Sequence, residues 1–164
     1  MPLNTGAMRM VPIFGLLCAL VSPAAGQDAL PGQTLAPYTM VSANGLPTIP
    51  APLTTKAGDA KTGQQVVIDR RLGNCLSCHE IGALRTEPFH GEIGPSLDGV
   101  AGRWDAAGLR MIVVNAKKVF GDGTAMPAFY RVDGLNRVRP EFAGKPILTA
   151  QQVEDVIAYL GTMK

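Results

Sequence analysis

Three side chains that commonly bind metals or cofactors lie close together in the stretch "GNCLSCHEIG", residues 73–82. Cys75, Cys78 and His79 span five positions of a 164-residue chain that has only three cysteines and two histidines. A disulfide between Cys75 and Cys78 would close a very small loop and would restrict the unfolded chain little. The triplet therefore indicates a bound group around which the chain must fold.

The pattern C-x-x-C-H is the attachment sequence of c-type haem. In this chemistry the thiols of Cys75 and Cys78 add to the haem vinyl groups and form thioethers, and His79 is held beneath the iron as its proximal ligand. A haem also supplies apolar core, which suits a chain whose predicted helices are short and separated by loops rich in glycine and proline. We therefore predict one covalent haem c, with its iron, as the cofactor.

The first 26 residues have the pattern of a secretory signal peptide. Arg9 precedes an apolar run from Val11 to Val21, and small residues follow. The run is too short to cross a bilayer, and prolines and a glycine interrupt it, so a retained membrane anchor fits less well. We predict cleavage of residues 1–26, together with Cys18, and export to the periplasm. Loss of Arg9 lowers the formal net charge from +2 to +1, and this near-neutral balance offers no basic stripe for nucleic acid. We expect no stable membrane insertion once residues 1–26 are removed.

Zinc binding and thiol redox chemistry are two other functions of closely spaced cysteines. A structural zinc site needs four protein ligands, and the mature chain offers only His90 in addition to the triplet, at a spacing that fits no zinc finger. His79 also directly follows Cys78, which makes it awkward for both side chains to reach one tetrahedral ion. A thioredoxin-like pair requires a surrounding βαβ pattern, which the sequence lacks. Both alternatives fit less well than haem.

Residues 27–57 and 58–164 differ in pattern. Residues 27–57 contain five prolines, few charges and no helical period, which predicts an extended arm. Residues 58–164 contain three segments with helical periodicity, each with a capping residue at its start, and no convincing strand. We therefore predict one all-α domain over residues 58–164. Its expected helices cover residues 60–72, 106–118 and 148–164.

The second axial ligand of the iron decides between electron transfer and ligand binding. Methionine is the usual partner of histidine in electron-transfer cytochromes, and it raises the reduction potential. Met126 lies in "GDGTAMPAF", where a glycine allows a sharp approach and a proline stiffens the exit. This loop suits delivery of one side chain to a metal, so we predict Met126 as the second ligand. The other candidates in the mature chain are Met40, Met111, Met163 and His90.

Four stretches together resemble the class I cytochrome c family: "GNCLSCH", "IGPSLDGVAGR", "AMPAF" and "LTAQQVEDVIAYL". The resemblance implies helices and long loops wrapped around one covalently attached haem. It also implies that the carbonyl of Pro95 accepts a hydrogen bond from His79 and that Leu97 lines the haem pocket. Gly63 and Val67 would pack the first helix against the last.

A longer set of motifs resembles the SoxX family of monohaem subunits in sulfur-oxidising SoxAX complexes. It covers most of residues 73–160, and the insert "GLNRVRPEFAGKPILTAQ" is specific to this group. The resemblance implies a heterodimer with the haem subunit SoxA, which joins thiosulfate oxidatively to a cysteine of a carrier protein, an L-cysteine S-thiosulfotransferase reaction. This chain would accept the electrons, pass them to a small soluble cytochrome and have no catalytic activity alone. A free-standing cytochrome shuttle and a haem sensor or peroxidase are the alternative functions.

Residues 131–147 are predicted to help dock the second subunit. The segment combines large apolar side chains with cations, which suits a protein interface. The alternative is that the apolar residues cover the haem edge and the cations are solvated. The apolar residues are Leu135, Val138, Phe142 and Ile147, and the cations are Arg131, Arg137, Arg139 and Lys145.

Overall fold

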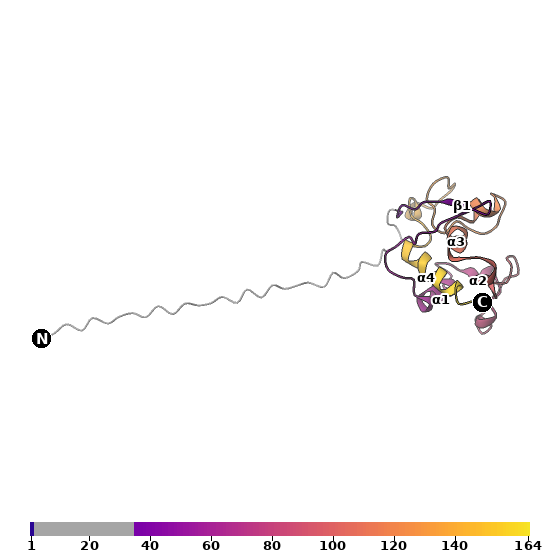
Figure 1. Ribbon diagram of the computed structural model, residues 1–164, viewed down its shortest axis with the longest axis horizontal. Helices are drawn as coiled ribbons and strands as arrows, with labels where there is room; N and C mark the ends of the chain where they lie inside the picture. Colours follow the sequence, from indigo (N-terminus) through magenta and orange to yellow (C-terminus); the bar gives the residue numbers. More distant parts are fainter. Residues whose placement is uncertain (2–34) are drawn as a thin grey trace.

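The computed structural model describes Met1 and residues 35–164, and Figure 1 shows the short helices gathered into one body. The predicted signal peptide, apart from Met1, and the beginning of the predicted arm lie outside the described residues. The α-helices of the described part are α1 (Ala60–Ile68), α2 (Val100–Arg103), α3 (Ala106–Phe120) and α4 (Ala150–Leu160). Its 3-10 turns are η1 (Cys75–Ser77), η2 (Gly82–Leu84) and η3 (Pro140–Phe142). None of the helices in residues 35–164 is long and apolar enough to span a membrane.

The three predicted helices are present, but their ends differ from the prediction. α1 ends at Ile68 instead of residue 72, because Asp69 leaves the helical conformation with a ψ of 118°. α3 continues past residue 118 to Phe120, and Gly121 ends it with a φ of +83°. α4 begins after Thr149, whose hydroxyl and the Gln152 side chain form the predicted capping box.

α1 and α4 pack closely against each other and form one side of the molecule (Figure 1). At Gly63 an added Cβ would lie 1.9 Å from the carbonyl oxygen of Asp155 in α4, so only glycine fits. Val67, one turn further along α1, is fully buried. The predicted contact between Gly63 and the last helix is therefore confirmed.

Residues 35–57, which we call the strap, pack against the helices. The strap contains the antiparallel strands β1 (Val41–Ala43) and β2 (Leu46–Thr48). Asn44 and Gly45 join them with φ values of 52° and 80°, a turn that an Asn-Gly pair adopts readily. The sequence predicted only an extended arm here, and this short hairpin was not predicted. The boundary between residues 57 and 58 stays a prediction.

A buried ion pair joins the strap to α3 and α4. Arg110 and Glu154 are each only 5% exposed, and two guanidinium nitrogens donate to the two carboxylate oxygens at 2.8 and 3.0 Å. A third guanidinium nitrogen donates to the carbonyl of Ile49 at 2.8 Å, and the Leu53 N–H donates to the Glu154 carboxylate at 2.9 Å. Both charges therefore have several partners, which offsets the cost of removing them from water.

Candidate functional site

The C-x-x-C-H motif lies in a tight turn directly after α1. Gly73 and Asn74 reverse the chain, and Asn74 has a left-handed φ of 47°. η1 follows, and the N–H groups of Cys78 and His79 donate to the Cys75 carbonyl at 3.1 and 3.0 Å. Cys75 and Cys78 are both free cysteines. The turn therefore keeps the motif compact and leaves both thiols unpaired.

His79 is oriented by the loop of residues 89–95. Its Nδ1 lies 2.6 Å from the carbonyl oxygen of Pro95, the contact that the sequence predicted. Because a carbonyl oxygen only accepts hydrogen bonds, Nδ1 carries the proton and donates it, which leaves Nε2 of the neutral ring as a metal ligand. Gly94 lies directly against the ring, since a Cβ there would be 2.3 Å from the His79 Cε1 atom. The loop therefore fixes both the tautomer and the orientation of the imidazole.

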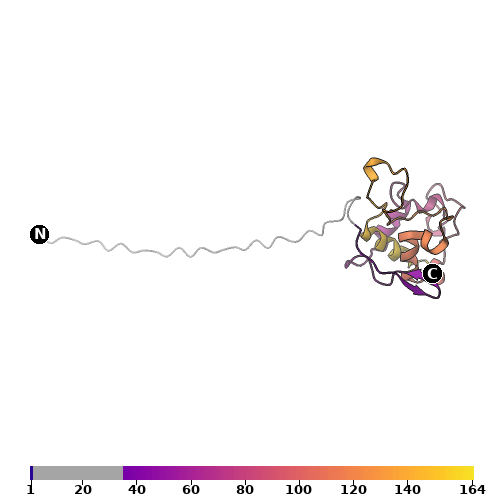
Figure 2. The ribbon, with the colours of Figure 1, turned by 90° about the horizontal axis from the view of Figure 1, so that it is seen from above.

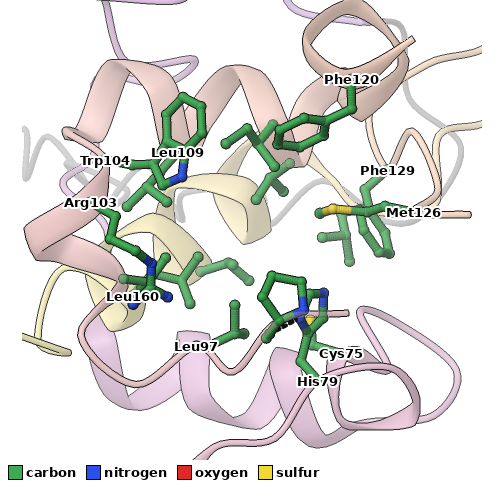
Figure 3. Close-up of a pocket in the computed structure, with 16 residues that line it drawn as sticks. Cys75, His79, Leu97, Arg103, Trp104, Leu109, Phe120, Met126, Phe129 and Leu160 are labelled. Carbon is green, nitrogen blue, oxygen red and sulfur yellow. Dashed lines mark hydrogen bonds between the residues drawn. The ribbon is translucent and has the colours of Figure 1, made fainter. Parts of the chain in front are cut away.

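A largely apolar cavity lies beside His79. Figure 3 shows Met126 across this cavity from His79, with Leu97 near its base. Cys75 and Pro95 also line the cavity, whereas Cys78 lines its adjoining opening. The remaining apolar wall consists of Val100, Trp104, Leu109, Ile112, Val113, Phe120, Phe129, Leu148, Val156 and Leu160.

The chemistry of this cavity suits a haem. Its apolar wall matches a porphyrin ring, the Cys75 thiol lines it with Cys78 in an adjoining pocket, and the imidazole of His79 and the thioether of Met126 lie across it from each other. Burial raises the pKa of the Cys75 thiol to about 12, so this thiol is neutral and is not a ready thiolate ligand or redox nucleophile. Within residues 35–164 no group of three His, Cys, Asp or Glu side chains is arranged to hold a metal ion. This geometry gives the zinc and thiol-redox alternatives no support.

Arg103 and Trp104 line the cavity but were not predicted as site residues. The Arg103 guanidinium donates to the carbonyls of Ser96 and Asp98, both at 2.7 Å. The Trp104 ring lies edge-on to Phe120 at 6.1 Å between centroids. A fixed guanidinium at an apolar cavity suits the carboxylate groups that a haem carries. In the sequence, Arg103 and Trp104 directly follow the motif around Pro95 and Leu97, in "GPSLDGVAGRW", and this position could have indicated that they lie at the cavity.

The competing ligands lie away from the cavity. His90 uses both ring nitrogens for backbone contacts: Nε2 is 2.9 Å from the Leu84 carbonyl, and Nδ1 accepts from the Ile81 N–H at 3.4 Å. Met111 is fully buried elsewhere in the core, and among the methionines of residues 35–164 only Met126 lines the cavity. His90 therefore braces the loop that follows the haem motif. Iron ligation by Met126 stays a prediction.

Comparison with known proteins agrees with this site. The cytochrome c family model matches residues 60–164. A chain in the crystal structure of SoxXA from P. pantotrophus is 48% identical to this chain, with a TM-score of 0.67, and the match covers 71% of this chain and 90% of that chain. No curated protein matches. The predicted fold, haem c and resemblance to the SoxX family are confirmed. The chain belongs to the cytochrome c family and has the class I fold with one covalent haem c.

Proposed function

We propose that this chain is the monohaem electron-transfer subunit of a SoxXA-type complex. Cys75 and Cys78 would hold the haem through thioethers, and His79 and Met126 would ligate its iron. The observation that carries this proposal is the pairing of His79, with Nδ1 bonded to Pro95, and Met126 across one apolar cavity. Two protein ligands leave no open position for a substrate, which favours electron transfer over a sensor or a peroxidase.

Each residue of the site has a distinct task. The bound haem supplies the one-electron chemistry of its iron. The hydrogen bond from His79 to Pro95 increases the basicity of the imidazole, whereas the neutral Met126 thioether favours reduced iron. Leu97 and the other apolar wall residues exclude water, which limits rearrangement of solvent when the charge changes.

The reaction of the whole complex determines how many electrons this subunit must accept. Joining thiosulfate to the thiol of a carrier-protein cysteine forms a sulfur–sulfur bond and releases an electron pair and a proton. A SoxA-type haem subunit performs this step, and this chain passes the electrons singly to a small soluble cytochrome. Cys75 and Cys78 are committed to the haem and are the only free cysteines among the described residues, so the chain itself has no cysteine there to carry sulfur. Residues 1–26 direct it to the periplasm.

Residues 131–147 help dock the SoxA-type subunit. Figure 2 shows η3 at the tip of a loop that projects from the helices. Phe142, in η3, is 53% exposed, Leu135 is 45% exposed, and only Ile147 of the four predicted apolar residues borders the opening of the haem cavity. These exposures favour an interface over a cover for the haem edge.

Spectroscopy of the purified holoprotein tests the ligand assignment. The oxidised protein should show a weak sulfur-to-iron band in the far red, and Met126→Ala should remove it and lower the reduction potential. Met111→Leu, in the core away from the cavity, is the control and should keep the band. A band that persists in Met126→Ala would assign the ligand to another methionine, and carbon monoxide binding to the reduced wild-type protein would favour a sensor or peroxidase.

Binding to the partner tests the docking surface. Replacing Arg137 and Arg139 with Glu should weaken association with the SoxA-type subunit without altering the haem spectrum. Arg71→Glu, an exposed change of the same sign outside this segment, is the control. Unchanged affinity in the double variant would reject docking through residues 131–147.

A further inference from the structure

The loop that carries Met126, residues 121–130, is attached to a kink in α3. Asn115 leaves the helical conformation inside α3, with φ −156° and ψ 84°. Just before the kink, the carbonyl of Val113 accepts a hydrogen bond from the N–H of Phe129 at 3.2 Å, and the next carbonyl accepts from the next N–H at 3.1 Å. The end of the loop is therefore fixed to the helix at the kink.

The centre of the same loop is attached at one point. The ammonium group of Lys117, on α3 just after the kink, donates to the carbonyl of Thr124. Thr124 and Met126 otherwise form hydrogen bonds inside the loop, to the Gly121 carbonyl at 3.2 Å and to the Thr124 hydroxyl at 3.4 Å. Within residues 35–164 no other hydrogen bond or ion pair joins residues 122–128 to a residue outside the loop.

We propose that Lys117 is a positioning residue for Met126, an inference that rests on the proposed ligation of iron by Met126. A bond from an ammonium group is stronger than a bond between neutral groups, so it holds Thr124 firmly against α3. Thr124 stands two residues before Met126 and its hydroxyl accepts the Met126 N–H, so a fixed Thr124 limits the movement of the ligand. Without this bond the loop opens more often and exposes the sixth coordination position to other ligands.

Imidazole binding to the oxidised holoprotein measures how often that position opens. Lys117→Met keeps a side chain of similar length and removes the donor, and it should raise the apparent imidazole affinity about tenfold, the factor that loss of one charged hydrogen bond supplies. Its far-red band should also weaken. Lys118→Met removes the same charge from an exposed neighbour whose side chain has no hydrogen bond within residues 35–164, and it should match wild type. Lys117→Arg, which keeps a charged donor, should restore most of the wild-type behaviour.

Met126→Ala in the same series separates the two proposals. If Met126→Ala raises imidazole affinity but Lys117→Met and Lys118→Met remain equal, Lys117 does not position the ligand. If Met126→Ala itself has no effect on affinity or on the far-red band, the ligand assignment fails first. A lower melting temperature of Lys117→Met with unchanged imidazole affinity would show a purely structural role and would overturn the inference. Should Lys117→Met not yield holoprotein, Lys117→Gln is compared instead, and an affinity equal to that of Lys118→Met would also reject it.

Discussion

The side of the molecule where α1 meets α4 and the side that contains the cavity are built differently. At the α1–α4 contact, Gly58 and Gly63 come so close to the carbonyls of Glu154 and Asp155 that an added Cβ would lie 2.1 and 1.9 Å from their oxygens. The other side surrounds a largely apolar cavity, and loops supply much of its wall. The first side is thus held by contacts within the polypeptide, whereas the second depends on a bound haem to complete its packing.

The two sides also differ in how polar groups are used. The Arg110–Glu154 pair is buried between α3, α4 and the strap, and backbone groups of Ile49 and Leu53 complete its hydrogen bonds. Around the cavity the polar contacts are hydrogen bonds to loop carbonyls, from His79 to Pro95 and from Arg103 to Ser96 and Asp98. A protein of this kind can therefore keep one side rigid while the environment of its iron is set by a few loop contacts.

Removal of the haem should have the largest effect on structure. It should destabilise the side that contains the cavity more than the side where α1 meets α4. Cys75→Ala combined with Cys78→Ala should abolish haem staining on a denaturing gel, because no thioether remains. Hydrogen exchange should then show loss of protection in residues 121–130 and partial retention in α1 and α4. Equal loss of protection on both sides, or intact protection of residues 121–130, would show that the haem does not selectively stabilise the side that contains the cavity.

Breaking the buried ion pair tests the side that is held by the polypeptide. Glu154→Gln leaves the Arg110 charge buried without its counter-ion and should lower the free energy of unfolding by about 3 kcal/mol. Glu141→Gln, which removes a partner from the exposed contact with Arg139, should change it by less than about 1 kcal/mol. Chemical denaturation of both holoproteins measures the difference, and similar values for the two variants would show that burial of the pair has no special role.

A matched pair of glycine substitutions tests the close helix contact. Gly63→Ala forces α1 away from α4 and should cost about 2 kcal/mol of stability. Gly102→Ala, in α2, meets no atom within 4 Å and should be neutral or slightly stabilising. Denaturation midpoints decide this, and a Gly63→Ala protein as stable as Gly102→Ala would mean that the helices can separate without cost.

The smallest expected effect concerns acid stability at the start of α1. Hydrogen bonds from the side chain and the backbone N–H of Thr62 lower the pKa of Asp59 below its usual value of 3.8. A carboxyl group with a lowered folded-state pKa stabilises the fold above its unfolded-state pKa, and this stabilisation is lost as the pH falls through the lowered value. Asp59→Asn still caps α1 but does not titrate, so its stability should fall less between pH 7 and pH 3, as denaturation at the two pH values would show. An equal fall in both proteins would exclude a contribution from Asp59.

The haem attachment site and the approximate helices could be predicted from the sequence because each depends on local chemistry, whereas the place of Leu97 in the cavity wall was implied by the family resemblance. Cys75, Cys78 and His79 are adjacent in the chain, so their spacing alone indicates the attachment site. The capping box of α4 needs only Thr149 and Gln152, one turn apart. These features could be recognised before any long-range contact was known.

The contacts of the strap, of the Arg110–Glu154 pair and of Lys117 became evident from the packing of the folded chain. Arg110 and Glu154 are 44 residues apart in the chain, and neither stands in a recognisable motif. The strap is joined to α4 by the hydrogen bond from the Leu53 N–H to the Glu154 carboxylate, and these two residues are 101 positions apart in the chain. The spacing of apolar residues along a sequence indicates which face of a single helix is buried. The partner of a buried charge is instead determined by how the helices pack against one another. For that reason the haem attachment motif was predictable from the sequence, but the hydrogen bond from Lys117 to the Met126 loop was not.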